Sequence, residues 1–253
     1  MSNYIKSHTD HTGVATIEFF HPQSNSLPGK MLNELAGEIH HAGLSADAKL
    51  IVLRSGGEKA FCAGASFDEL AAINNEKDGH AFFSGFARVI NSMRTCPKLI
   101  IGRIQGKCVG GGVGLAAAVD YAIATAAAEI KLSELAIGIG PFVVGPAIER
   151  KIGNAGFTQL AIDATSWRNA DWAKRKGLFA EVHDSIENMD ESIARLAHTL
   201  SHASPQAMAA LKKIAWKGTE DWDQLLDERA AISGKLIVGE FSKQAIAKFK
   251  SSR

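Results

Sequence analysis

The sequence predicts an α/β protein with largely parallel strands, followed by an all-helical C-terminal region. Short apolar runs such as residues 50–53 and 99–101 are bounded by Gly, Pro or polar clusters, which is typical of buried strands. Amphipathic stretches such as residues 78–93 separate these runs up to about residue 182, and such alternation favours parallel pairing. Beyond that point only helical spacing remains.

The N-terminal part of the chain predicts two paired strands and a helix. Residues 13–20 are rich in β-branched and aromatic side chains, so we expect a strand there, paired with residues 3–8. A helix is expected over 28–44, where a proline occupies the favourable first turn. A loop of small residues at 59–66 then leads into a further helix.

The centre of the chain combines a strand, a glycine turn and a helix start. After the apolar run 99–101, three consecutive glycines at 110–112 open an Ala-rich segment with good helix propensity. Glycine leaves the main chain bare, and the first N–H groups of a helix have no partner inside it. Because the helix dipole also favours negative charge here, we expect this turn to stabilise an anion. Further strands are expected at 119–124 and 129–132.

The last part of the chain predicts helices only. Apolar residues at helical spacing place a helix around 193–200, and others at 204–216, 221–238 and 239–250. We therefore divide the chain into a core of residues 1–190 and a helical region of residues 191–253. Several apolar side chains exceed what a detached helical tail could hide, so we expect them to pack on the core or on a neighbouring subunit. They are Leu225, Leu226, Ile232, Leu236 and Ile237.

Composition and charge indicate an ordinary soluble globular protein, with 46% hydrophobic and 22% charged residues. The net charge of +1 predicts neither a nucleic-acid partner nor an electrostatic membrane partner. No apolar signal core opens the chain, and Asp120 interrupts the longest apolar tract. Cys62, Cys96 and Cys108 lack metal-ligand spacing and suit a reducing compartment. We expect a cytoplasmic protein without a metal site.

Two loops of small residues, 62–66 and 109–114, each follow a strand. The carboxyl ends of parallel strands are where open α/β sheets build their sites. If both loops face one spot, two backbone N–H groups can hold a carbonyl oxygen as an oxyanion hole. Tight packing is the alternative explanation for each loop. The spacings of a phosphate-binding loop and of a dinucleotide fingerprint are both absent.

Glu134 is a lone carboxylate among apolar neighbours in the segment 132–141. Such a residue can act as a general acid or base. The alternative is structural: Ser133 would cap a helix, and Glu134 would lie in its favourable first turn. The residues and their spacing alone leave both the catalytic and the structural role open.

Five segments in this order resemble the enoyl-CoA hydratase/isomerase (crotonase) family. They are His21–Leu27, similar to a CoA-contacting loop; Lys59–Ser66, with Ser66 where the family has Asp; Gly106–Asp120; Glu134–Pro141; and Gly177–Phe179. The resemblance implies a crotonase-like ββα spiral core with a C-terminal helical region, assembled as a homotrimer or homohexamer. It also implies an acyl-CoA thioester substrate in fatty acid metabolism. Coenzyme A then enters as part of the substrate, and no separate cofactor is expected.

Carried over by position, the resemblance assigns the oxyanion hole to the backbone N–H groups of Ala65 and Gly111. Family hydratases use two glutamates; the second matches Glu134, but the first falls on Gly114, which has no side chain. Phe142 stands where some relatives place an aspartate for dehalogenase or dienoyl-isomerase chemistry, and we expect it to wall an apolar acyl pocket. The expected substrate-binding residues are Asn25, Lys59, Cys62, Ala63, Gly64, Gly110, Gly114 and Phe142.

The missing glutamate favours a 3,2-enoyl-CoA isomerase, because moving a double bond needs one carboxylate whereas hydration needs a base and an acid. One alternative is an enoyl-CoA hydratase, including the methylglutaconyl-CoA type, in which Glu134 works with a water or with Asp68 or Glu69. The other alternative is a CoA-binding member that has lost catalysis.

Overall fold

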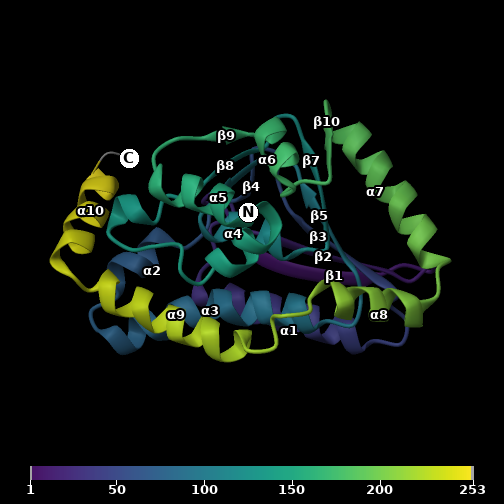
Figure 1. Ribbon diagram of the computed structural model, residues 1–253, viewed down its shortest axis with the longest axis horizontal. Helices are drawn as coiled ribbons and strands as arrows, with labels where there is room; N and C mark the ends of the chain where they lie inside the picture. The colour runs from purple at the N-terminus through teal and green to yellow at the C-terminus, as the bar shows by residue number, and fades with distance from the viewer. Residues whose placement is uncertain (1, 252–253) are drawn as a thin grey trace.

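The computed structural model describes residues 2–251 and contains two β-sheets surrounded by helices (Figure 1). The larger sheet has six strands in the order β1-β2-β3-β5-β7-β10, and the smaller has four in the order β4-β6-β8-β9. The strands of the larger sheet are β1 (Tyr4–Thr9), β2 (Val14–Phe20), β3 (Leu50–Ser55), β5 (Ile100–Ile104), β7 (Tyr121–Thr125) and β10 (Glu181–His183). Those of the smaller are β4 (Ala60–Cys62), β6 (Lys107–Val109), β8 (Glu129–Lys131) and β9 (Arg168–Asn169).

The order of the elements confirms the predicted ββα spiral. Three times, a strand of the larger sheet is followed by a short strand of the smaller sheet and then by a helix. Pairing is parallel except between β1 and β2 and between β8 and β9. This arrangement brings the ends of β4, β6 and β8 to one place, and the helices that follow begin there.

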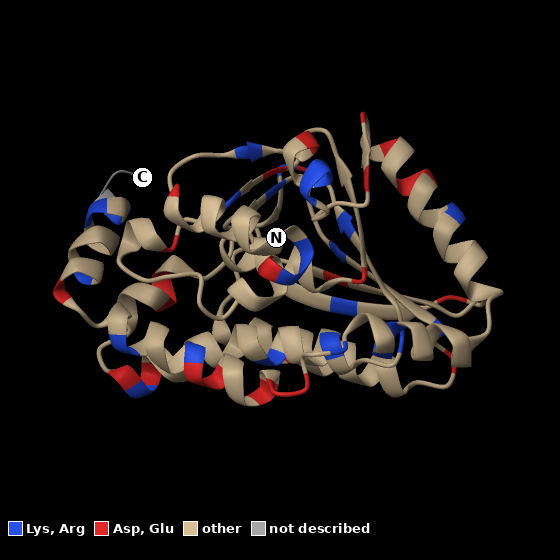
Figure 2. Ribbon diagram, in the orientation of Figure 1, with Lys and Arg blue, Asp and Glu red and all other residues tan. Residues whose placement is uncertain are grey.

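The helices before residue 186 cover the sheets and position the loops between them. They are α1 (Gly29–Leu44), α2 (Phe67–Ala72), α3 (Glu76–Thr95), α4 (Gly111–Ala118), the 3₁₀ turn η1 (Leu135–Ile137), α5 (Gly145–Ile162) and α6 (Ala170–Lys176). Helix α4 lies near the centre of the molecule and carries no charged residue, whereas charges lie along the outer helices (Figure 2). Helix α5 was not expected from the sequence, and Gly153 interrupts it with non-helical dihedral angles.

The central strands β3, β5 and β7 of the larger sheet are buried on both faces, which explains their continuous apolar runs. One face contributes to the main core. On the other, Leu50, Val52 and Ile101 pack against Met189 and Ile193 of α7 (Ile186–Ser201). Helix α7 thus packs as part of the core that contains the larger sheet. The expected division at residue 190 falls inside this helix.

The remaining C-terminal helices are α8 (Pro205–Ala215), α9 (Trp222–Ile237) and α10 (Glu240–Ser251). They share the main core rather than forming their own, since Leu226 and Ile237 are buried in it. In Figure 1, α9 runs alongside α3 below the sheets. Ile232 and Leu236 remain 46% and 39% exposed. The expected packing on the core is observed for Leu225, Leu226 and Ile237, whereas packing of Ile232 and Leu236 on a neighbouring subunit stays a prediction. Within residues 2–251, no helix combines the length and apolarity needed to cross a bilayer.

Candidate active site

The two small-residue loops lie directly against each other, because they follow the paired strands β4 and β6. Gly64 has a φ of +83°, a conformation that favours glycine. A Cβ there would lie 2.6 Å from the carbonyl oxygen of Val109 and 3.1 Å from the main-chain nitrogen of Gly111. Only a bare main chain permits this approach, so Gly64 joins the loops of residues 62–66 and 109–114.

The main-chain N–H groups of Ala65 and Gly111 are oriented by local hydrogen bonding. In the parallel bridge between Leu27 and Ala65, the Leu27 amide donates 2.7 Å to the Gly64 carbonyl and the Ser66 amide donates 3.2 Å to the Leu27 carbonyl. This pattern turns the Ala65 N–H away from Leu27. Gly111 begins α4, so its N–H has no acceptor within the helix. Both residues line one cavity, where two amides can hold one oxygen atom.

Glu134 lines the same cavity and lies over the second loop. A Cβ on Gly110, whose φ is +51°, would lie 2.6 Å from Oε1 of Glu134. Oε2 is buried without a hydrogen-bond partner among the described residues. Removal from solvent raises the pKa of Glu134 to about 7, while its own main-chain amide lowers it in part. Glu134 can therefore exchange a proton near neutral pH.

The alternative structural role for Glu134 is not observed. The turn that follows is only three residues long, and its N-cap is Glu134 rather than Ser133. No side-chain hydrogen bond caps this turn. The backbone is instead fixed by the amides of Ile137 and Ile139, which each donate 3.1 Å to the Glu134 carbonyl.

The inner cavity has a volume of about 50 Å³ and is predominantly apolar. It brings together seven of the residues expected from the sequence: Ala63, Gly64, Ala65, Gly110, Gly111, Glu134 and Phe142. The ring of Phe86 closes over one of the loops, since a Cβ on Gly111 would lie 2.2 Å from its Cε1. Among the described residues that line this cavity, Glu134 is the only carboxylate.

A larger outer cavity of about 320 Å³ adjoins the inner one. The two share a neck formed by Ala63, Ala65, Phe67, Val109, Ser133 and Ile137. Helix α10 covers this region: Phe249 lines the outer cavity and stacks on Phe67 with ring centroids 4.3 Å apart. Lys250 forms an ion pair of 3.2 Å with Asp68 of α2.

Two residues of the outer cavity were missed by the sequence analysis. Trp167 and Lys131 both line it, and the Lys131 Nζ lies 4.4 Å from the centre of the Trp167 ring. The Nζ of Lys107 lies 4.8 Å from the same ring. The antiparallel pairing of β8 with β9 brings these side chains together, and no local pattern in the sequence indicates that pairing.

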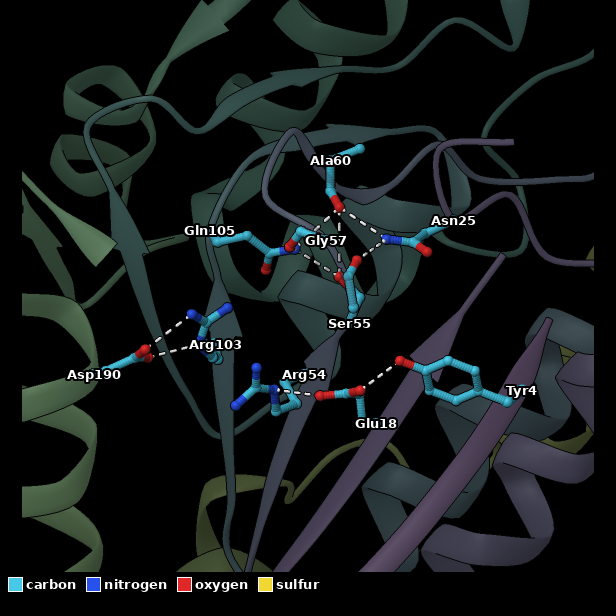
Figure 3. A network of polar contacts seen from close by, with 11 residues as sticks. Tyr4, Glu18, Asn25, Arg54, Ser55, Gly57, Ala60, Arg103, Gln105 and Asp190 are labelled. Atoms are coloured by element: carbon cyan, nitrogen blue, oxygen red, sulfur yellow. Dashed lines mark hydrogen bonds and ion pairs between the residues drawn. The ribbon is translucent and has the colours of Figure 1, made fainter. Parts of the chain in front are cut away.

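Asn25 lines neither cavity; it fixes the backbone that leads into the loop of residues 62–66 (Figure 3). Its buried side-chain amide donates to the carbonyl oxygens of Gly56 at 2.8 Å and Ala60 at 2.9 Å. The Nε2 of Gln105 also donates to the Ala60 carbonyl, at 3.1 Å. The network holds the turn from which β4 begins.

Three more expected substrate-binding residues lie outside the linings of the inner and outer cavities. Cys62 is fully buried, and burial raises the pKa of its thiol to about 12. Lys59 is exposed, and its carbonyl accepts a hydrogen bond from the Lys107 amide. Gly114 is buried inside α4 against Val144, which does line the inner cavity.

The acidic residues considered as partners of Glu134 are occupied elsewhere. The Glu69 carboxylate accepts a 2.7 Å hydrogen bond from the Gly29 amide at the start of α1. Asp68 accepts a hydrogen bond from Gln23 and pairs with Lys250. Neither lines the inner or outer cavity. In the part of the chain described, no three His, Cys, Asp or Glu side chains are grouped as metal ligands.

Residues 9–250 match the family model described as "Enoyl-CoA hydratase/isomerase", and the chain belongs to this family. It is 27% identical over 243 residues to a short-chain-enoyl-CoA hydratase of Clostridium acetobutylicum, covering 95% of this chain and 92% of that one. It is 29% identical over 217 residues to a peroxisomal Delta(3,5)-Delta(2,4)-dienoyl-CoA isomerase of Arabidopsis thaliana, covering 79% and 76%. The crystal structure of an enoyl-CoA hydratase from Bacillus halodurans superposes with a TM-score of 0.88 at 21% identity, covering 97% of this chain and 99% of that one. That likeness shows the shared fold.

Proposed function

We propose that this protein is an acyl-CoA enzyme that moves a double bond from the 3- to the 2-position of an enoyl thioester. The observation that carries the proposal is that Glu134 is the single carboxylate among the described residues lining the inner cavity, beside the amides of Ala65 and Gly111. The relatives' names include both a hydratase and an isomerase, so the choice between them rests on the site.

The reaction begins when the Glu134 carboxylate removes a proton from C2 of the 3-enoyl thioester. The electrons move onto the thioester oxygen, which becomes a dienolate held by the amides of Ala65 and Gly111. Glu134 then returns the same proton at C4, and the carbonyl re-forms beside the new 2,3 double bond. Atoms and electrons balance without a cofactor, since coenzyme A arrives as part of the substrate.

The two adjoining cavities support a CoA thioester as substrate. The inner cavity is apolar and suits the acyl group, and the outer cavity has room for part of the carrier. The thioester then lies at their shared neck, where Ala65 is found. A positive charge from Lys131 at the wall of the outer cavity suits the phosphates of coenzyme A.

Hydration is the second candidate, and the structure gives it less support. Water must be activated by one group and the α-carbon protonated by another. Asp68 and Glu69 lie outside the inner cavity, and Val144 occupies the space that a side chain at position 114 would need. Hydratase activity, including the methylglutaconyl-CoA type, would require Glu134 to perform both steps.

The test is a side-by-side assay of 3-enoyl and 2-enoyl CoA thioesters with the wild type and Glu134→Gln. We expect isomerisation to dominate in the wild type and to fall by at least about 100-fold in the variant, with thioester binding retained. Glu34→Gln is the matched control, because Glu34 pairs with Lys30 on the exposed face of α1. Dominant hydration would favour the second candidate, and binding without turnover in the wild type would indicate a non-catalytic CoA-binding protein.

A further inference from the structure

We infer that the acyl pocket accepts short acyl groups of about four carbons and excludes medium and long chains. The inference deepens the proposed function and rests on it. Its basis is the small volume of the inner cavity and the way three elements close it: helix α3, helix α9 and the segment 139–144.

Helix α3 closes the inner cavity with aromatic rings. Phe83 and Phe86 both line it and are 7% and 3% exposed. They are held by Phe82, whose ring packs edge-on against both, with centroids 5.5 Å and 6.4 Å away. Rings packed in this way cannot turn aside without losing contacts on several sides. The α3 wall is therefore rigid.

Helix α9 closes the next side by direct contact with α3. A Cβ on Gly79 would lie 2.8 Å from the Cα of Gly234, so the two helix backbones touch. The adjacent Ser233 lines the inner cavity and is 1% exposed. Its hydroxyl donates 3.2 Å to the Arg229 carbonyl within the helix. No acyl chain can pass between α3 and α9 at this crossing.

The segment 139–144 forms the remaining wall. Phe142 and Val143 line the inner cavity and are absent from the lining of the outer one. The Phe142 ring folds back over its own segment, since a Cβ on Gly140 would lie 2.4 Å from Cζ. Because Phe142 is only half-buried, it is the wall residue whose removal disturbs the core least.

The volume sets the length of the acyl group. A site for one water molecule needs about 10–15 Å³. A cavity of about 50 Å³, whose lining includes the neck, therefore holds roughly three to five heavy atoms. Because the carrier occupies the outer cavity, a longer chain has no space on that side.

The experiment compares CoA, butanoyl-CoA, octanoyl-CoA and decanoyl-CoA by isothermal titration calorimetry. These saturated thioesters bind without reacting, so the result does not depend on the catalytic step. We expect butanoyl-CoA to bind at least tenfold more tightly than octanoyl-CoA or decanoyl-CoA. A pocket that accepts longer chains would instead gain about fourfold in affinity for each added CH₂. That rising series would overturn the inference while leaving the proposed function intact.

Absence of binding by every thioester would overturn the proposed function together with the inference. A variant locates the wall: Phe142→Ala should raise the affinity ratio of octanoyl-CoA to butanoyl-CoA at least tenfold. Phe20→Ala is the matched control, since Phe20 is also half-buried but stacks on Tyr4 away from both cavities. An unchanged ratio in Phe142→Ala would contradict the assignment of this wall, and the wild-type series decides the chain length even if the variant does not fold.

Discussion

The carboxylate of Glu134 lies directly over Gly110, so closely that a single added carbon on Gly110 would come within 2.6 Å of Oε1. Gly110 precedes Gly111, the first residue of α4, and Gly111 lines the cavity that Glu134 also lines. The Glu134 carboxylate therefore lies over the residue next to Gly111, whose amide is one half of the expected oxyanion hole. This placement makes the protonation of Glu134 the property from which the first two predictions follow.

The value of kcat/KM for isomerisation should rise with pH and level off above about 7. Proton removal needs the ionised form of Glu134, and burial raises its pKa to about 7. The profile of kcat/KM reports the ionisation of the free enzyme. It should be measured between pH 5 and pH 9 with a 3-enoyl thioester. A rate that falls as Glu134 ionises would show that the residue acts first as an acid.

Glu134→Gln should gain stability relative to the wild type as the pH rises from about 4.5 to about 7. In the unfolded chain Glu134 ionises near 4.5, but in the folded protein it holds its proton until about pH 7. The folded state binds the extra proton between these values, so wild-type stability falls as the pH rises through this window. The loss amounts to about 3 kcal/mol.

Denaturant unfolding of both proteins from pH 4 to pH 8 measures this effect. Other titrating groups are common to both, so the difference between the two free energies of unfolding isolates Glu134. A difference that stays constant with pH would mean that the carboxylate is solvated in the folded protein.

Gly114→Glu alone should destabilise the protein, because a Cβ there would lie 2.5 Å from Cγ1 and 2.6 Å from Cβ of Val144. Removing the Val144 side chain leaves its Cα as the nearest atom of that residue, at 3.5 Å. Gly114→Glu/Val144→Gly therefore offers a second carboxylate a place at the inner cavity. Hydration of a 2-enoyl thioester should rise by about 100-fold over Val144→Gly. If a folded double variant gains no hydration, the single carboxylate does not explain the preference for isomerisation.

Lys131→Ala should weaken binding of butanoyl-CoA by up to about fivefold, with a smaller effect at high salt. The lysine stands at the outer cavity beside Trp167, where we place the phosphates of the carrier. Binding of a pantetheine thioester, which lacks the nucleotide, should be unaffected. Lys30→Ala on the exposed face of α1 serves as the control. An equal loss for both thioesters would place Lys131 outside phosphate recognition.

The family and fold class could be predicted because their signals are local. Apolar runs such as 50–53 and helical spacing such as 204–216 each depend on neighbouring residues, and both agree with the structure. The three-residue strand β6 was missed because a segment of that length has no periodicity of its own. The alternative in which Ser133 caps a helix was wrong, because only the three-residue turn Leu135–Ile137 follows and its N-cap is Glu134.

Details of the site depended on contacts between distant parts of the chain. The contact of Val144 with Gly114 joins the residue that precedes α5 to helix α4. The cluster of Lys107, Lys131 and Trp167 requires the register of the smaller sheet. No spacing in the sequence encodes these distances, so Glu134 could be selected as a candidate while its surroundings could not.

The contact between Phe86 and Gly111 limits how this protein could acquire a new acyl preference. The Phe86 ring lines the inner cavity and also rests on the first turn of α4, so a smaller side chain there would loosen the amide expected to hold the thioester oxygen. A substitution of Phe86 would therefore change the preferred acyl-chain length and the turnover together. Phe142 lines the same cavity and folds over Gly140 rather than over α4. Evolution or engineering toward bulkier substrates should therefore replace Phe142 before Phe86.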